Sequence, residues 1–455
     1  MMKANILIAL TLSFAGYSLQ QPSMKTVSIR SKEHEKIHDI KITNDAEIHK
    51  IQNCGNTEFV NLSGMYIRNI QNNVIQSDAI RHVSLHHNFF KKIPQNILNY
   101  VTYLSCFNLS RNSINLYKNN QIQHTYLQVL DLSYQTTSDV NAIPQTETFD
   151  EETEDMYKYM TFDSSNIKLP NLEYLDLSGN DISTLLWGFN KSFPKLVRLD
   201  LVNINAQELD PHFFYKIPSS LRVLHLENNH LRNLTLQNVA EITSLYLNGN
   251  PLEQLNINST KLQTLSLSNC TKLSAAFFDT PYLEILDLSR NNLNNEIGVH
   301  YEMFRALRVL LLDYNKFSYI PTLNNVQWVK ELSLCYNMIK HISPNNFKYL
   351  TSLNKLSLKG NRIDNLERET FSGLDKLEYL DLSENNLNHL PTDWASPLKN
   401  LKYLNVNSNK FASISEMGIY SIISLNHLFV RNNTFTKITT MEIEPLPDFI
   451  TIFLV

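Results

Sequence analysis

The chain has 455 residues, of which 43% are apolar and 18% are charged, and its formal net charge is −4. This composition supplies a continuous core and lacks the excess of basic residues that is typical of nucleic-acid-binding proteins. Only ten residues are glycine, and no phosphate-binding loop, nucleophile elbow or metalloprotease motif occurs. We therefore expect a non-enzymatic protein with no catalytic residue, no metal ion and no cofactor.

Residues 1–18 have the features of a secretory signal peptide. Lys3 precedes an apolar run over 6–14, and small residues follow at Gly16 and Ser18. The run is shorter than the roughly 20 residues that a membrane-spanning helix needs. This favours cleavage near Ser18 over an N-terminal anchor. Residues 19–56 then form an N-terminal flank or cap.

From residue 57 to residue 438 the chain repeats the pattern L-x-x-L-x-L-x-x-N. In one copy, leucines 377, 380 and 382 precede Asn385. The closing asparagine, called the ladder residue below, is found at Asn88, Asn112, Asn180, Asn229, Asn250, Asn291, Asn315, Asn337, Asn361, Asn385, Asn409 and Asn433. Degenerate copies place Met65, Gln135, Ile204 and Cys270 at that position, which gives about sixteen units.

A period of about 20–25 residues with this pattern is typical of a leucine-rich repeat. The x-L-x-L-x segment predicts a short strand whose leucines face inward. The ladder residue is expected to hydrogen-bond backbone groups of its own turn and of the neighbouring coil. Phe347 and Phe371, each ten residues after a ladder residue, are expected to stack on the convex side. The prediction is an α/β leucine-rich repeat solenoid with a parallel concave sheet and an irregular or short-helical convex side.

One interruption separates Gln135 from Asn180, where about 136–168 form an insertion. Its centre, residues 150–155, is rich in acidic side chains. Insertions into repeats usually emerge as loops, often on a binding face. Two interpretations fit this segment: a solvated acidic loop, or a tether that captures a basic partner.

Residues 439–455 are expected to begin a further repeat. A step of 24 residues from the preceding copy places the apolar residues Phe449, Ile452 and Leu454 where the pattern requires them. The sequence then stops at Val455, before a ladder residue. Because a solenoid needs a cap at each end, we expect that the natural chain continues; the alternative is a bare edge strand.

Seven Asn-x-Ser/Thr sequences support export, since this motif accepts N-linked glycans in secreted proteins. They begin at Asn61, Asn108, Asn190, Asn233, Asn258, Asn269 and Asn432. Asn61 and Asn108 fall between two inward leucine positions. Glycans on these two residues would close the N-terminal part of the concave sheet to a large ligand.

The four cysteines, Cys54, Cys106, Cys270 and Cys335, form no C-x-x-C cluster. Cys270 occupies a ladder position, where a buried thiol substitutes for asparagine. Cys106 and Cys335 lie at outward strand positions too many repeats apart to pair with each other. Cys335 is therefore a candidate for an intermolecular disulfide, and a buried, inert thiol is the alternative.

The outward positions of the strands are candidates for ligand binding, because they do not serve the core. One distinctive stretch covers three neighbouring strands and has no glycosylation motif at its outward positions. It combines tyrosine and arginine, which are typical binding anchors, with a leucine that we expect to be exposed. The candidate ligand-binding residues are Arg290, Leu311, Asp313, Tyr314 and Tyr336.

The repeats with the sequence LDLSxNxLxxL, the signal peptide and the glycosylation motifs resemble extracellular animal leucine-rich repeat proteins over residues 57–455. The repeat sequences are similar to those of insect leucine-rich immune proteins and of Toll-type and chaoptin-type ectodomains. The resemblance implies a protein or microbial-surface ligand, another leucine-rich repeat protein, or a complement-like factor as partner. The Cys-rich cap and coiled-coil tail of the immune family, and the membrane helix and signalling domain of Toll, do not occur within these 455 residues.

Two functions fit these observations. The favoured one is a secreted, extracellular recognition protein of innate immunity that binds its ligand with the concave sheet. The other is the ectodomain of a cell-surface adhesion or signalling receptor, in which case a membrane anchor would follow residue 455. Neither function involves nucleic acid.

Overall fold

Repeated short strands build the protein, whose architecture comes from a computed structural model. The described residues are 28–30, 58–71, 74–117, 121–136, 161–237, 241–273, 275–296 and 304–454. The chain divides into two compact units. The first unit comprises residues 41–292 and 297–311, and the second unit comprises residues 1–40, 293–296 and 312–455.

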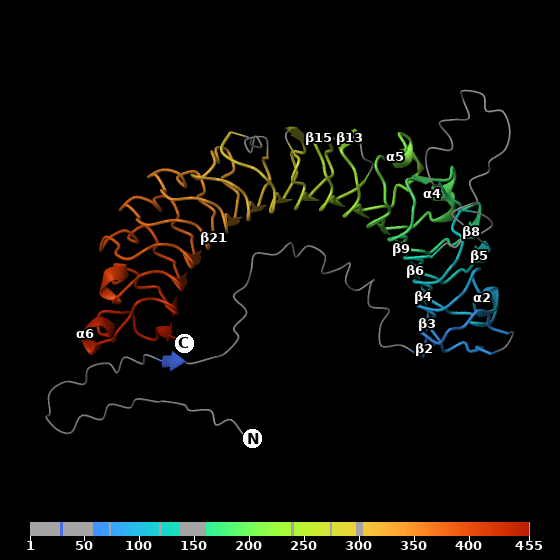
Figure 1. The fold of residues 1–455 in the computed structure, drawn as a ribbon, viewed down its shortest axis with the longest axis horizontal. Helices are drawn as coiled ribbons and strands as arrows, with labels where there is room; N and C mark the ends of the chain where they lie inside the picture. Colours follow the sequence, from blue (N-terminus) through green and yellow to red (C-terminus); the bar gives the residue numbers. More distant parts are fainter. Residues whose placement is uncertain are drawn as a thin grey trace, which may run out of the picture. The chain divides into compact units, whose positions relative to one another are not determined.

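A parallel sheet runs through the first unit, with one strand from each repeat. Its strands, in order of pairing, are β2 (Phe59–Asn61), β3 (His82–Ser84), β4 (Cys106–Asn108), β6 (Val129–Asp131), β9 (Tyr174–Asp176), β11 (Arg198–Asp200), β12 (Val223–His225), β14 (Ser244–Tyr246), β16 (Thr264–Ser266), β18 (Ile285–Asp287) and β19 (Val309–Leu311). In Figure 1 these strands line one side of the ribbon, and helices α2 (Gln95–Tyr100), α4 (Phe189–Ser192) and α5 (Phe213–Lys216) lie on the other. The outward surface of this sheet is called the strand face below.

The second unit has the same construction. Its parallel strands are β20 (Glu331–Ser333), β21 (Lys355–Ser357), β22 (Tyr379–Asp381), β23 (Tyr403–Asn405), β24 (His427–Phe429) and β25 (Thr451–Phe453). Strand β1 (Ser28–Arg30) also pairs with β25, with Ile29 opposite Ile452. The predicted parallel sheet is therefore present in both units.

The two-residue alternation of a strand explains the core. The central leucine of each strand points inward, and Leu332, Leu356 and Leu380 are all fully buried. Register pairs each central leucine with that of the next strand, so the apolar side chains form a continuous column. No coil could bury its leucines without its neighbours.

The ladder asparagines hold successive coils together, as predicted. The Asn361 Nδ2 atom donates hydrogen bonds to the carbonyl oxygens of Leu334 and Leu358, both at 2.9 Å, while its Oδ1 atom accepts one from the Ile339 N–H group at 3.1 Å. Gln135 makes equivalent bonds in its repeat. All these asparagines are buried except Asn433, which is half-buried. The ladder thus satisfies backbone groups that the core would otherwise leave unpaired.

The residue before the ladder position adopts a left-handed backbone, with φ of 53° at Tyr336 and 69° at Gly360. A Cβ atom on Gly360 would lie 2.4 Å from Cδ1 of the Tyr336 ring, so the tyrosine packs directly on the glycine backbone. Glycine is needed at this position because it combines a positive φ with room for the neighbouring ring.

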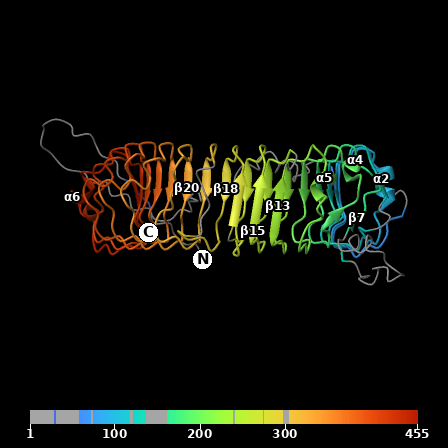
Figure 2. The ribbon, with the colours of Figure 1, turned by 90° about the horizontal axis from the view of Figure 1, so that it is seen from above.

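The side opposite the strands is irregular. Strands β13 (Asn233–Gln237), β15 (Gln254–Asn258) and β17 (Ala275–Asp279) form a small parallel sheet there, and β13 and β15 are visible in Figure 2. Short pairings join β5 (Gln121–Gln123) to β8 (Asn166–Lys168), and β7 (Thr161–Phe162) to β10 (Thr184–Leu185). The second unit contributes the 3-10 helix η3 (Ser415–Met417) and helix α6 (Thr440–Ile443).

An aromatic spine fills the interior of the second unit, as predicted. The Phe347 and Phe371 rings stack with centroids 5.9 Å apart, and Trp394 meets Phe371 edge-on at 5.6 Å. All three side chains are fully buried. The Trp394 Nε1–H group donates a hydrogen bond to the Met417 carbonyl oxygen at 2.7 Å, which provides a partner for the only polar atom of the spine.

Two segments singled out in the sequence are partly described. Most of the predicted insertion (136–168), including its acidic centre, lies outside the described residues, as do the predicted signal peptide (1–18) and almost all of the flank (19–56). Residues 161–168 contain strands β7 and β8 rather than a loop.

In the predicted further repeat (439–455), β25 pairs in register with β24. There Ile450 is buried and Phe449 is 75% exposed, so the leading apolar position is one residue later than expected.

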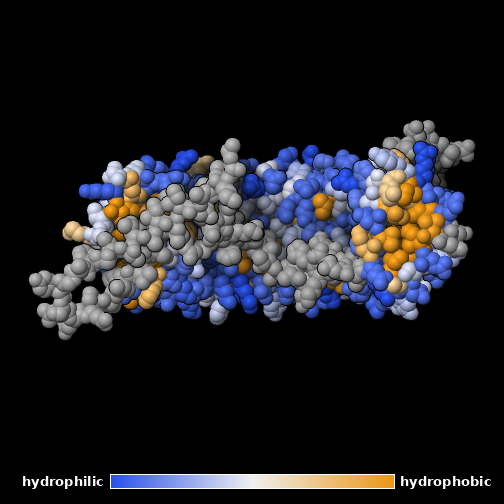
Figure 3. Space-filling view, turned by 90° about the horizontal axis from the view of Figure 1, so that it is seen from below, coloured by the Kyte–Doolittle hydropathy of each residue, from blue (hydrophilic) through white to orange (hydrophobic). Residues whose placement is uncertain are grey.

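An apolar surface marks the first described repeat, where orange atoms gather at the right of Figure 3. Phe59, Met65 and Val74 are at least half exposed there. Val60 and Leu62, which face inward, are half-buried, although their counterparts in later coils are fully buried.

The ladder predicts a large effect for one substitution. Asn361→Ala should lower the free energy of unfolding by roughly 2–4 kcal/mol, because two carbonyl groups and one N–H group lose a buried partner. Urea denaturation followed by circular dichroism measures it. The exposed Asn365 in the same coil provides the control, and Asn365→Ala should change stability little. Equal effects of the two substitutions would contradict a structural role for the ladder.

Candidate functional site

A row of polar side chains crosses the middle of the strand face in the first unit. In-register pairing places Asp131, Asp176, Asp200, His225 and Tyr246 side by side on β6, β9, β11, β12 and β14. Adjacent strands are about 4.8 Å apart, so each side chain contacts the next. This polar row brings together three carboxyl groups, an imidazole and a phenol.

Two of these carboxylates close the turn that follows their strand. Oδ1 of Asp131 accepts hydrogen bonds from the Ser133 N–H group at 3.0 Å and from its hydroxyl at 2.7 Å. Oδ1 of Asp176 accepts one from the Ser178 N–H group at 2.9 Å. Asp381 makes the same bond to Ser383 in the second unit. The aspartate of the LDLS repeats therefore has a structural role in addition to its place on the surface.

Asp200 instead forms a buried ion pair. Arg198 Nε and Nη2 donate hydrogen bonds to its two carboxylate oxygens, both at 2.8 Å, and the Tyr174 hydroxyl donates a third at 2.8 Å. The guanidinium lies 5.0 Å from the centroid of the Tyr174 ring. Burial, followed by the charge of Asp200, raises the pKa of Tyr174, so the phenol remains a donor. Arg198 therefore balances the charge of Asp200, and the hydrogen bonds of its carboxylate are made within the protein.

His225 and Glu227 carry buried polar atoms without partners. Nδ1 of His225 lies 2.8 Å from Oε1 of Glu227, and the imidazole stacks on Tyr246 with centroids 4.4 Å apart. The His225 Nε2 atom is 4.0 Å from the Asp200 carboxylate, and neither it nor Glu227 Oε2 has a hydrogen-bond partner in the described part of the chain. Because a carboxylate only accepts, the His225 Nδ1–H group donates this hydrogen bond to Glu227.

Asp176 is the proton-sensitive member of the row. Burial, together with the neighbouring charges of Asp131 and Asp200, raises the pKa of Asp176 to about 7. Its carboxyl group therefore changes charge near neutral pH, whereas an ordinary aspartate is fully ionised there. The charge of the row consequently depends on pH in the physiological range.

The residues selected from the sequence are placed differently from the expectation. Leu311 is 5% exposed, so the expectation of an exposed leucine is wrong; side chains on neighbouring strands pack closely enough to bury it. Leu311 and Arg290 belong to the first unit, whereas Asp313, Tyr314 and Tyr336 belong to the second.

Within the second unit, the selected tyrosines do come together. The rings of Tyr314 and Tyr336 stack with centroids 4.5 Å apart, and Tyr314 is 43% exposed. Oδ1 of Asp313 accepts hydrogen bonds from the Cys335 N–H group at 2.7 Å and from the Ser333 hydroxyl at 2.5 Å. Asp313 therefore has a structural role, and the tyrosine pair remains a candidate contact surface.

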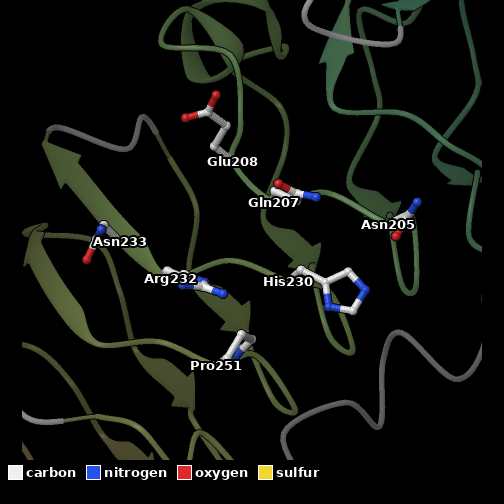
Figure 4. Close-up of a pocket in the computed structure, with 7 residues that line it drawn as sticks. All are labelled: Asn205, Gln207, Glu208, His230, Arg232, Asn233 and Pro251. Carbon is white, nitrogen blue, oxygen red and sulfur yellow. The ribbon is translucent and has the colours of Figure 1, made fainter.

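A polar hollow of about 660 Å³ lies beside the strand face, on the segments that follow β11, β12 and β14 (Figure 4). It is lined by Asn205, Gln207, Glu208, His230, Arg232, Asn233 and Pro251. All of these except Pro251 are exposed, and the Glu208 carboxylate points away from His230 in Figure 4. The hollow is open and its polar lining is exposed, so it is a weaker candidate for a binding site than the polar row.

The seven predicted glycosylation motifs all lie in described segments. Asn61 and Asn108 are on β2 and β4, as expected, and their Oδ1 atoms accept hydrogen bonds from the Ser63 and Ser110 N–H groups, respectively, both at 3.0 Å. Asn190 lies on α4, Asn233 and Asn258 lie on β13 and β15, and Asn269 and Asn432 precede ladder positions. Their glycosylation remains a prediction.

The described cysteines divide into two kinds. Cys106 is disulfide-bonded, whereas Cys270 and Cys335 are free; Cys54 lies outside the described residues. Sγ of Cys270 donates to the Leu247 carbonyl oxygen at 3.4 Å, which fits its predicted ladder role. Burial and the nearby Asp313 charge raise the pKa of Cys335 to about 12.

A leucine-rich repeat family model matches residues 194–252, 305–363, 351–411 and 376–435, and a second leucine-rich repeat model matches 168–184 and 281–299. The chain is similar to mouse RP105 in its complex with MD-1, with a TM-score of 0.59, 17% identity and coverage of 85% of this chain and 73% of that chain. The protein has the leucine-rich repeat solenoid fold.

Two further structures share this leucine-rich repeat fold. TLR13 in a complex with ssRNA13 gives a TM-score of 0.52 at 20% identity over 82% of this chain. The chain spans 62% of the length of TLR13. A leucine-rich repeat protein of Leptospira interrogans gives a TM-score of 0.52 at 21% identity, over 87% of this chain and 95% of that chain.

The described part of the leucine-rich repeat chain contains no cluster of three or more His, Cys, Asp or Glu residues that could hold a metal ion. In the same ranges, none of the helices has the length and hydropathy that crossing a bilayer requires.

The raised pKa of Asp176 predicts pH-dependent stability. Its folded pKa of about 7 exceeds the unfolded value, so the ionised carboxylate destabilises the fold above pH 7 and this penalty disappears as the pH falls toward 4. Asp176→Asn should raise the free energy of unfolding by roughly 1–3 kcal/mol at pH 8 and have little effect at pH 4.5. Urea titrations at the two pH values measure this.

Asp287 provides the control for this prediction. It makes the same turn hydrogen bond, to Ser289, but its row neighbours are Ser266 and Leu311. Asp287→Asn should therefore show no such gain at pH 8. A gain of equal size for both variants would contradict the carboxylate coupling.

The environment of Cys335 predicts slow alkylation. With the pKa near 12, little thiolate exists at pH 7.5, so iodoacetamide should modify native Cys335 at least about 100-fold more slowly than the unfolded chain. Mass spectrometry follows the reaction, with Cys335→Ser to assign the site. Rapid native labelling, or a disulfide-linked dimer on non-reducing electrophoresis, would favour the intermolecular disulfide instead.

Proposed function

We propose that this protein is a secreted, non-enzymatic recognition protein of innate immunity, which binds a protein or microbial-surface ligand with the strand face of its first unit. The observation that carries the proposal is a pair of buried polar atoms without hydrogen-bond partners among the described residues, Nε2 of His225 and Oε2 of Glu227. Buried polar atoms normally have partners. A ligand with a donor for Glu227 and a polar group for His225 would satisfy both atoms.

The charge of the polar row indicates the kind of ligand. Asp131, Asp176 and Asp200 add carboxyl groups on the preceding strands of the row, and the Arg198 guanidinium is paired with Asp200. A basic side chain of a partner protein matches this surface in both charge and hydrogen bonding. Phosphate groups do not, which disfavours nucleic acid.

Other observations support an extracellular location and a protein partner. The predicted signal peptide and the glycosylation motifs favour an extracellular protein. Among proteins of similar fold, RP105 forms a complex with the protein MD-1, which is consistent with a protein partner here. A leucine-rich repeat protein or a complement-like factor is the partner class that the resemblance suggests.

A second function, the ectodomain of a cell-surface receptor, is favoured by one observation. Strand β25 pairs in register with β24 and begins a further repeat. A longer chain that continued the solenoid could carry a membrane anchor. Immunoblots of body-fluid and membrane fractions after deglycosylation distinguish the two functions: a soluble species supports secretion, and a larger, membrane-bound species supports the receptor.

Binding itself can be tested with a matched pair of variants. Glu227→Gln replaces a free acceptor by a donor, and we expect it to weaken partner binding about 10- to 100-fold, the effect of losing one charged hydrogen bond. Glu241→Gln makes the same substitution at a half-buried glutamate that pairs with Lys261 and should leave binding unchanged. Quantitative mass spectrometry of extracellular proteins retained by immobilised wild type and by each variant identifies the partner, and titration of that purified partner measures affinity. Identical retention on all three would contradict the proposed site.

A further inference from the structure

An exposed aromatic cluster lies on the side of the first unit opposite the strands. Trp187 is 64% exposed and Tyr215 is 74% exposed. The His212 ring lies between them, with centroid distances of 5.8 Å to Trp187 and 6.1 Å to Tyr215. These residues flank or belong to α4 and α5, which are neighbours in Figures 1 and 2. So much exposed aromatic surface in one place calls for something that covers it.

Buried charges hold the indole of Trp187 in place. The Lys216 ammonium is 5.1 Å from the centroid of the Trp187 ring, a cation–π distance. Lys216 itself is only 6% exposed; it forms an ion pair with Asp210 and a 2.9 Å hydrogen bond to the Thr184 hydroxyl. The lysine cannot move easily without losing both partners. Trp187 is therefore preorganised, yet most of its surface remains free.

The contacts of the ring are polar: the His212 imidazole lies 5.8 Å and the Lys216 ammonium 5.1 Å from its centroid. Asn190 and Lys191, on the neighbouring first turn of α4, are exposed. A flat aromatic ring with a polar rim fits the C–H face of a sugar, which stacks on the ring while its hydroxyl groups bond to the rim. It fits an aliphatic protein surface less well, because the rim would be desolvated without partners.

A glycan acceptor lies three residues from Trp187. Asn190 begins the sequence Asn-Lys-Ser, and Gly188, with φ of 94°, turns the chain between the indole and α4. The Asn190 side chain is exposed and has no hydrogen-bond partner in the described part of the chain. By contrast, the side-chain oxygens of Asn61 and Asn108 each accept a hydrogen bond from a backbone N–H group.

We propose that Asn190 carries an N-linked glycan whose first N-acetylglucosamine packs on Trp187. This inference rests on the proposed secretion. In the modification, Asn190 Nδ2 forms a bond to C1 of the sugar of a lipid-diphosphate-linked oligosaccharide, the lipid diphosphate leaves, and an amide proton passes to solvent. The short tether keeps the sugar at high effective concentration above the ring.

The test is a double-mutant cycle in two forms of the full chain. Wild type, Asn190→Gln, Trp187→Phe and the double variant are produced in a glycosylating eukaryotic cell and, without glycans, in bacteria. Glycopeptide mass spectrometry reports the occupancy of all seven motifs. In the glycosylated form we expect each single substitution to lower Tm by about 2–4 °C, and the double variant to be no worse than either single variant.

The possible outcomes distinguish failure of the proposed glycan contact from failure of the proposed secretion. In the protein made in bacteria, the two substitutions should lower Tm by smaller amounts, and their effects should be additive. If the two substitutions were equally coupled in both forms, Trp187 would act without the sugar, which would overturn the proposal. An unoccupied Asn190 beside other occupied motifs would also overturn it while leaving the proposed secretion intact. A chain retained inside the cell with no occupied motif would instead contradict the proposed secretion. Asn233→Gln, at another exposed motif, is the control and should show no coupling to Trp187.

Discussion

The hydrogen bonds of the ladder residues are the interaction on which the remaining structure depends. Each coil is too short to bury its own leucines, and stacking the coils would strand the carbonyl and N–H groups of the turns in an apolar interior. One side-chain amide per repeat supplies donors to two carbonyl oxygens and an acceptor to an N–H group, as Asn361 does. The ladder fixes the offset between coils, and the one-to-one register of the strands follows from it.

That register creates surface chemistry as well as a core. Residues about two dozen positions apart in the chain become neighbours, so a side chain favoured in every repeat is repeated as a row of like groups. Asp131, Asp176 and Asp200 are such a row, and burial together with the neighbouring charges raises the pKa of Asp176. Arg198 balances the charge at one end by pairing with Asp200. The polar row thus arises from an aspartate that closes the turn of its own repeat, and Arg198 and His225 modify it locally.

Much of the fold followed from the sequence because its determinants recur at fixed spacing. The leucines, the ladder asparagines and the Phe347–Phe371 spine all belong to the period. The left-handed residue before each ladder position was missed, since Tyr336, Arg290 and Gly360 share no side-chain property that marks it. The burial of Leu311 was also misjudged, because outward positions were treated as solvated although neighbouring strands crowd them.

The polar row was only partly apparent from the sequence. Asp131 and Asp176 share the aspartate position of the LDLS repeats and are direct neighbours on β6 and β9, but the effect of burial on their carboxyl groups has no local sequence signal. Arg198 and His225 bond to Asp200 and Glu227, two residues along the same coil, whereas the rings that they contact, Tyr174 and Tyr246, come from adjacent coils.

Two buried groups differ in how fully their hydrogen bonds are satisfied. Asp200 has three hydrogen bonds from Arg198 and Tyr174, so its burial adds rigidity and leaves little to offer a ligand. His225 and Glu227 satisfy each other at one atom each, and the second atom of both has no hydrogen-bond partner in the described part of the chain. Such an arrangement costs stability in the free protein. The proposed ligand would recover that cost on binding by supplying the missing hydrogen bonds, next to the rigid Asp200 ion pair.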